Sequence, residues 1–230
     1  MRDHPRPATL VVVARVDDAT TPESFGHLLA AVRGRGAMVT WAMTPATLAR
    51  LSARLPGENA VLALDGATAA SRRELRRGID EFRRVQRAVE AVMFPVETSV
   101  SHGDLLVETG VRVVGVDRFE DSGRGSRRPP PHGWQCRSSR WGLWEVRTAP
   151  VSASGLARWL PWAGRMAPGS LAVERVELAA DPTVAAAKLA RTVERYDLGS
   201  GRIRTVRLAM LADILGPGAQ AGGRSVLRAA

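Results

Sequence analysis

The feature that most constrains the fold is a regular alternation of apolar, strand-like runs with amphipathic, helix-like segments. The first run, Thr9–Val16, is almost wholly apolar, which is typical of a strand buried on both faces of a sheet. Further strand-like and helix-like segments follow in turn as far as residue 216. Strands joined by helical crossovers pair in parallel, and helices cover their faces. The sequence therefore predicts an α/β fold, either a closed barrel or an open doubly wound sheet.

The chain of 230 residues is long enough for one large domain, which we expect to span residues 1–216. A stretch rich in proline and arginine at 119–140 is expected to be a long surface loop, and 217–230 a flexible tail. The expected strands are 9–16, 37–43, 59–64, 91–95, 111–116, 141–146, 170–178 and 203–206, and the expected helices begin near residues 22, 45, 72, 101, 154, 182 and 208.

The net charge of +10 and the pI near 11.4 initially suggest a nucleic-acid-binding surface. However, Lys188 is the only lysine among 33 basic residues, which indicates a biased composition more than a selected binding surface. The arginines between residues 72 and 87 lie off the apolar stripe of a predicted helix, so they are expected to form a solvated face. We do not expect a nucleic-acid partner.

The apolar runs and the cysteine content set the expected location. Runs such as Leu10–Ala14 are far shorter than the roughly 20 residues of a membrane helix, and we identify no signal peptide. A single cysteine, Cys136, excludes an intramolecular disulfide and fits a reducing compartment. A cytoplasmic protein with no membrane partner is expected.

Two adjacent carboxylates, Asp17 and Asp18, directly follow the first strand. The carboxyl ends of parallel strands meet at one opening, where sites concentrate in this fold class. Adjacent carboxylates repel each other unless one binds a cation or carries a proton. An Asp-Asp pair also commonly caps the next helix, so both interpretations stay open here.

The segment Arg15-Val16-Asp17-Asp18-Ala19 and the order of elements over residues 8–216 resemble the polysaccharide deacetylases, the NodB-homology family of carbohydrate esterases. The resemblance implies a deformed (β/α) barrel of six to seven parallel strands, with Asp17 as the catalytic base and Asp18 as a metal ligand. At the family's two metal-binding histidines this chain has Asp65 and Ala69. Asp18 and Asp65 could hold one divalent ion (Zn, Mn or Mg) only weakly, or none.

Three further residues are candidates for substrate binding. Glu97 follows the fourth predicted strand, and His102 opens the helix after it. Trp141 belongs to a group of tryptophans in the second half of the chain whose rings could stack on sugars or fill the core. In place of the family's late histidine motif the chain has Leu171–Glu177, where Glu174, Arg175 or Glu177 could face the cleft.

The resemblance implies a polysaccharide deacetylase-like protein that would remove an acetyl group from an N-acetylated sugar or related amide. A metal lowers the pKa of bound water from about 16 to about 7, and a general acid adds roughly 10²–10⁴-fold. Because both are largely lost, we expect a degenerate or inactive member that binds a carbohydrate or N-acylated small molecule. The alternative is a non-catalytic scaffold that binds a protein or an anionic polymer through its arginine-rich surface.

Overall fold

The computed structural model describes residues 7–55, 60–95, 100–116, 136–139, 141–150, 166–178, 181–196 and 198–216. Its strands are β1 Ala8–Arg15, β2 Val39–Met43, β3 Ala60–Ala63, β4 Ala91–Met93, β5 Val113–Val116, β6 Cys136–Ser138, β7 Trp144–Arg147, β8 Ala149–Pro150, β9 Leu171–Glu177 and β10 Ile203–Thr205. Its α-helices are α1 Pro22–Arg33, α2 Pro45–Leu51, α3 Gly66–Ala70, α4 Arg72–Val85, α5 Gly103–Glu108, α6 Pro182–Glu194 and α7 Leu211–Leu215, with 3₁₀ turns η1 Ser52–Arg54 and η4 Leu198–Ser200.

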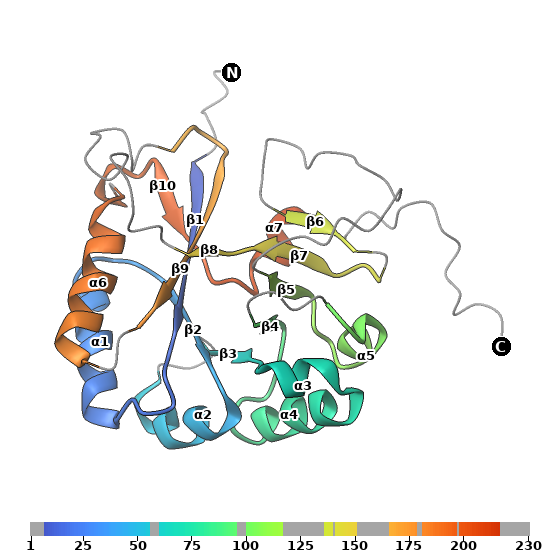
Figure 1. The fold of residues 1–230 in the computed structure, drawn as a ribbon. Helices are drawn as coiled ribbons and strands as arrows, with labels where there is room; N and C mark the ends of the chain where they lie inside the picture. The colour runs from blue at the N-terminus through green and yellow to red at the C-terminus, as the bar shows by residue number, and fades with distance from the viewer. Residues whose placement is uncertain are drawn as a thin grey trace.

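The described strands form one strongly curled sheet in the order β6-β7-β5-β4-β3-β2-β1-β9-β8, with β10 paired to β1 (Figure 1). Neighbouring strands are parallel except for β6 and β7. Only Thr148 separates β7, which pairs with β5, from β8, which pairs with β9. This short segment therefore joins the two ends of the strand order, and the predicted deformed (β/α) barrel is confirmed.

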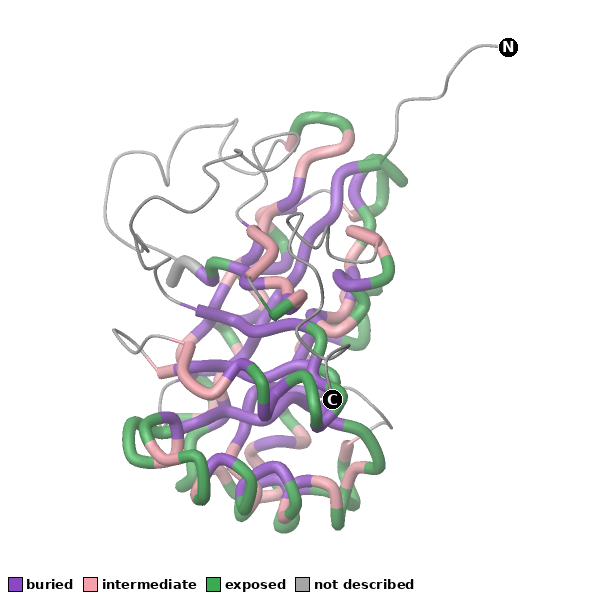
Figure 2. The backbone as a smooth tube through the Cα atoms, turned by 90° about the vertical axis from the view of Figure 1, so that its right-hand side faces the viewer, coloured by how far each residue is buried: buried purple, intermediate pink, exposed green. Residues whose placement is uncertain are grey.

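Side chains of β1 alternate between two apolar clusters. Leu10, Val12 and Ala14 pack with the helices, in a cluster that includes Phe25 of α1. Val11 and Val13 belong to a second cluster inside the curl of the sheet, together with residues of every strand from β2 to β7. Buried strands therefore occupy the centre, while exposed residues gather on the outer helices (Figure 2). Since both faces of β1 are buried, its sequence has to be apolar throughout.

Side-chain caps position the helices that leave the carboxyl ends of the strands. The Thr21 hydroxyl accepts from the Ser24 N–H at 3.2 Å, at the start of α1. Thr44 caps α2 in the same way, and proline at the first helical position follows both threonines. Ser71 caps α4 through the N–H of Glu74. These helix starts are where the cap-and-proline signals predicted them.

The segment after β10 covers the amino end of the barrel. The Leu208 N–H donates to the Thr40 hydroxyl at 2.9 Å, and Arg112, next to the start of β5, pairs with Asp213 of α7 at 2.6 Å. Leu211 and Ala212 of α7 belong to the inner apolar cluster. This packing leaves the carboxyl ends of the strands as the open end.

The predicted loop over 119–140 is wrong for residues 136–138, which form β6. β6 is held because Cys136 is buried in the inner cluster and Arg137 donates to Glu145 of β7 at 2.6 Å. The rest of that loop up to 135, the expected helix over 154–163 and the tail 217–230 lie outside the described residues. The five-residue helix α3 was not predicted, since it is too short to show a helical period.

Cys136 provides a chemical test of this packing. Burial raises the pKa of its thiol from 9.0 to about 11. Near pH 8 the folded protein should then carry about 100-fold less thiolate, and alkylation by iodoacetamide should slow by about that factor relative to the urea-unfolded chain. The double variant Cys136→Ser/Arg33→Cys, with its cysteine on the exposed end of α1, is the matched control. Equal alkylation rates in the folded wild-type protein and this control would contradict the burial of β6.

Candidate functional site

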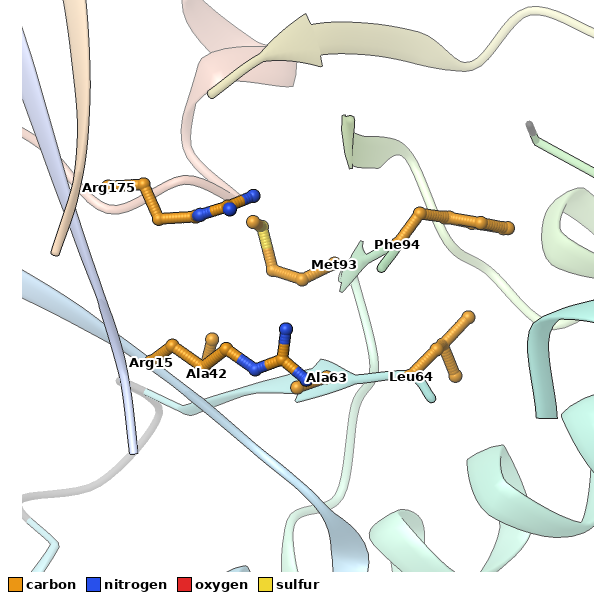
Figure 3. Close-up of a pocket in the computed structure, with 7 residues that line it drawn as sticks. All are labelled: Arg15, Ala42, Ala63, Leu64, Met93, Phe94 and Arg175. Carbon is orange, nitrogen blue, oxygen red and sulfur yellow. The ribbon is translucent and has the colours of Figure 1, made fainter. Parts of the chain in front are cut away.

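A small pocket lies at the carboxyl ends of the strands, inside the curl of the sheet. Its walls are formed by residues at or near the carboxyl ends of five strands: Arg15, Ala42, Ala63, Leu64, Met93, Phe94 and Arg175. Its volume is about 10 Å³, so it has room for roughly one water molecule. Figure 3 shows the guanidinium groups of Arg15 and Arg175 extending from neighbouring strands toward the Met93 side chain.

Strand register places both arginines on the inner face. On the β1–β9 ladder, Val13 lies opposite Arg175 and Arg15 lies opposite Glu177. Alternate residues of a strand face the same side, so Arg15 and Arg175 continue the inner rows that begin with Val11 and Val173. The two guanidinium groups are thus diagonal neighbours across the sheet.

The two arginines differ in how they are held. Arg175 is only 5% exposed, and its Nε lies 2.8 Å from a carboxylate oxygen of Glu177. Arg15 is partly buried, and its side chain makes neither a hydrogen bond nor an ion pair within the described part of the chain. A guanidinium carries five donors, so Arg15 brings unused hydrogen-bonding capacity into the pocket.

Asp18, the predicted metal ligand, is engaged in local structure. Its carboxylate accepts from the Thr44 hydroxyl at 2.7 Å and also from the Thr47 hydroxyl, while Arg50 donates to its backbone carbonyl. The hydrogen bonds from Thr47 and Thr44, and more weakly the charges of Arg50 and Arg15, hold the pKa of Asp18 below its usual value. Asp18 thereby ties the β1–α1 loop to the start of α2.

Asp65, the second predicted ligand, caps α3. Its carboxylate accepts from the Thr68 N–H at 2.7 Å. Bonds from Thr68 lower the pKa of Asp65, and the charge of Arg15 contributes to the same shift. Arg15 therefore influences both Asp18 and Asp65, although it is bonded to neither.

Asp17, the predicted base, is exposed and accepts from the Ala19 N–H at 2.7 Å in a tight turn. It does not line the pocket. Its predicted catalytic role stays a prediction.

The side chains present do not fit a metal ion of the kind that the resemblance implies. No group of three His, Cys, Asp or Glu side chains within the described ranges could hold one. Asp18 already accepts hydrogen bonds from two threonine hydroxyls, and Asp65 accepts one from a backbone N–H as the cap of α3. The cationic side chain of Arg15 projects into the pocket close enough to act on both. A cation would meet like charge there.

The predicted substrate-binding residues lie apart from the pocket. His102 precedes α5 in a left-handed conformation with φ 55°, and its Nε2 lies 3.3 Å from the Ala70 carbonyl. Trp141 is exposed and packs on Gly103, where any Cβ would come within 2.3 Å of the indole. His102 and Trp141 are therefore close together beside α5, but neither lines the pocket. Glu97 lies outside the described residues.

Of the three late-motif candidates, Arg175 faces the pocket and Glu177 pairs with it. Glu174 faces the helix layer, where it accepts from the Tyr196 hydroxyl. The sequence interpretation missed Arg15, even though Arg15 lies two residues after Val13 on the same strand face. Arg15 is the only charged residue in the run Thr9–Val16, and this was the sequence signal that could have identified it.

No model of a known protein family matches this chain, and no curated protein sequence matches it. Solved structures do. A protein classed as a polysaccharide deacetylase from Mycobacterium smegmatis superposes with a TM-score of 0.57 at 13% identity, covering 98% of this chain and 97% of that one. A 4-alpha-glucanotransferase from Thermococcus litoralis gives 0.55 at 11% identity over 91% of this chain and 40% of that one.

A family 4 carbohydrate esterase from Bacillus anthracis is less similar, with a TM-score of 0.47, 15% identity and coverage of 90% and 83%. The two stronger similarities show that this chain has the fold of polysaccharide deacetylases. The same fold also serves a glucanotransferase, so the fold alone does not select an activity. Function has to be argued from the residues at the mouth of the barrel.

The hydrogen bonds that Asp18 accepts from Thr44 and Thr47 predict a pH-dependent loss of stability in Asp18→Asn. We expect a loss of about 1 kcal/mol at pH 7 in urea unfolding, below the range of about 1.5–3 kcal/mol for bonds to a charged group because the carboxylate is exposed. The pKa of Asp18 is lowered in the folded protein, so its stabilisation is present above about pH 4 and fades as pH falls further. Asp17→Asn, which alters one turn bond, is the control. An equal loss in both variants would contradict the assignment.

Proposed function

We propose that this protein is a divergent polysaccharide deacetylase family member that binds a small sugar-derived or N-acylated molecule without metal-dependent hydrolysis. The observation that carries the proposal is the Arg15 side chain, which projects into the pocket at the carboxyl ends of the strands. The positive charge of Arg15 stabilises the ionised carboxylates at the mouth of the barrel, as a bound cation would.

The charges at the mouth support this proposal. Asp18 and Asp65 are stabilised as carboxylates by hydrogen bonds and by the charge of Arg15. They therefore need no metal ion to offset their charges. An incoming divalent ion would have to displace threonine hydroxyl and backbone N–H donors and overcome repulsion from the guanidinium group.

The groups that line the pocket cannot carry out the proton transfers of amide hydrolysis. A guanidinium group has donors and no acceptor atom, so neither Arg15 nor Arg175 can act as a general base. The other lining residues are apolar. If hydrolysis is retained, Asp17, whose side chain accepts a turn bond from the Ala19 N–H, would have to activate the water.

A cytoplasmic location of the protein is part of the same proposal. Within the described ranges, no helix has the length and apolar character needed to cross a lipid bilayer. The sole cysteine of the chain is a buried thiol, which supports the expected cytoplasmic location.

Calorimetric titration of chelator-treated protein with Zn²⁺, Mn²⁺ and Mg²⁺ tests the loss of metal dependence. We expect no saturable binding in the wild-type protein and no difference from Asp18→Ala, because hydrogen bonds and Arg15 already compensate the carboxylates. Arg15→Gln is the informative companion, since it removes the competing charge. Tight binding that disappears in Asp18→Ala would contradict the proposal and restore a metal-dependent hydrolase.

Release of acetate from chitooligosaccharides, with and without added metal, tests hydrolysis directly. We expect no release above the rate of Asp17→Asn, because the pocket holds no general base. Metal-stimulated release of acetate that Asp17→Asn abolishes would show metal-dependent hydrolysis and contradict the proposal. Circular dichroism of both proteins controls for folding.

A further inference from the structure

The two arginines of the pocket point to the chemistry of the bound molecule. Resting on the proposed function, we propose that the pocket of Arg15 and Arg175 binds the carboxylate of a small, singly charged ligand such as a sugar acid. Arg15 is the carboxylate's direct hydrogen-bond donor, and Arg175 supplies a second positive charge beside it.

The placement of the guanidinium groups suits an anion. They leave neighbouring parallel strands as diagonal neighbours on the inner face and extend into the same space (Figure 3). A guanidinium presents paired N–H donors in a plane that matches the two oxygens of a carboxylate. The Arg15 guanidinium group has no hydrogen-bond or ion-pair partner within the described part of the chain, so a ligand oxygen would satisfy its unused donors.

Of the two arginines in the pocket, Arg175 is the one whose side chain is held in place. It is nearly fully buried, and the carboxylate of Glu177 lies 2.8 Å from its Nε. Glu177 is also directly opposite Arg15 in the β1–β9 register. The contact shows that a carboxylate can approach a guanidinium at this place in the barrel. Because Glu177 fixes Arg175, the ligand does not have to order that side chain.

The other walls set the size and polarity of the group that enters. They consist of Ala42, Ala63, Leu64, Met93 and Phe94, none of which carries a polar side chain. The volume is about 10 Å³, room for roughly one water molecule, so a carboxylate enters only if a wall residue moves. Met93 lies against the space over Gly115, where a Cβ would come within 2.2 Å of its sulfur. A flexible Met side chain at this point can move to admit a carboxylate.

The surrounding acids select against multiply charged ligands. Glu177 pairs with Arg175, and Asp18 and Asp65 lie near enough for the charge of Arg15 to act on them. Two guanidinium groups attract a phosphate dianion more strongly than a monoanion, but three carboxylates also repel it more strongly, and together the five groups carry a net negative charge. The distribution of charge therefore favours a carboxylate over a phosphate ester.

Ligand-observed NMR with matched sugars tests the proposal. The probes are D-glucuronate, D-glucose and glucose 6-phosphate, which differ in the charge of one substituent, together with acetate as the smallest carboxylate. We expect saturable binding of glucuronate and acetate in the millimolar range, with glucose and glucose 6-phosphate at least about 10-fold weaker. Absence of binding by both carboxylates, or tighter binding of the phosphate, would overturn the proposal.

Variants show whether binding occurs at the pocket. Arg15→Gln should weaken glucuronate binding about 10- to 100-fold, since a charge-assisted bidentate contact is lost. Arg15→Lys keeps the charge but not the planar fork, so an intermediate loss is expected. Arg33→Gln removes the same charge from the exposed end of α1 and should change nothing. Equal affinity in Arg15→Gln and Arg33→Gln would locate binding elsewhere and overturn the assignment.

The same protein samples show whether a negative result contradicts the carboxylate site alone or also the proposed function. Titration with Zn²⁺ reports on the proposed loss of metal dependence, whether or not glucuronate binds. If Zn²⁺ does not bind and neither carboxylate binds, the carboxylate site is wrong while the metal-free function stands. If Zn²⁺ binds and Asp18→Ala abolishes this, the proposed function fails, and the carboxylate site that rests on it fails too.

Discussion

The two-residue alternation of side chains along curled parallel strands is the constraint from which the rest of this structure follows. One face of each strand packs on helices, and the other fills the interior of the barrel, so β1 has to be apolar on both faces. The inner row of β1 runs Val11, Val13 and then Arg15, where the apolar interior gives way to the mouth. The same alternation on β9 leads from Val173 to Arg175. Two buried strands thus deliver two guanidinium groups to one small space.

The positive charge of Arg15 helps to stabilise the neighbouring carboxylates of Asp18 and Asp65. Asp18 and Asp65 occupy positions where the resemblance implies metal ligands, yet threonine hydroxyls bind Asp18 at the start of α2 and a backbone N–H binds Asp65 as the cap of α3. Threonine at 44 and 47 gives Asp18 a structural role that accounts for an aspartate at that position without a metal. The fold itself is shared with proteins of different named activities. The identity of the side chains at the mouth therefore has to decide the function.

Much of the fold could be predicted from the sequence, because apolar runs and helix caps are local signals. The capped starts of α1, α2 and α4 lie where Thr21, Thr44 and Ser71 indicated. β6 was missed because its three residues are too few to show the alternation of a strand before its hairpin pairing with β7 is known. At the site, the search for motif residues found Asp18 and Asp65 but not their bonds, since hydrogen-bond partners are set by tertiary packing.

The central claim is that a guanidinium group, and not a metal ion, is the cation at the mouth of this barrel. A crystal structure determined after soaking in Zn²⁺, with data collected at the zinc absorption edge, tests it most directly. We predict no anomalous peak among Asp17, Asp18 and Asp65, and an ordered Arg15 side chain pointing into the pocket. A zinc peak bonded to Asp18 and Asp65, with Arg15 displaced from the pocket, would contradict the claim.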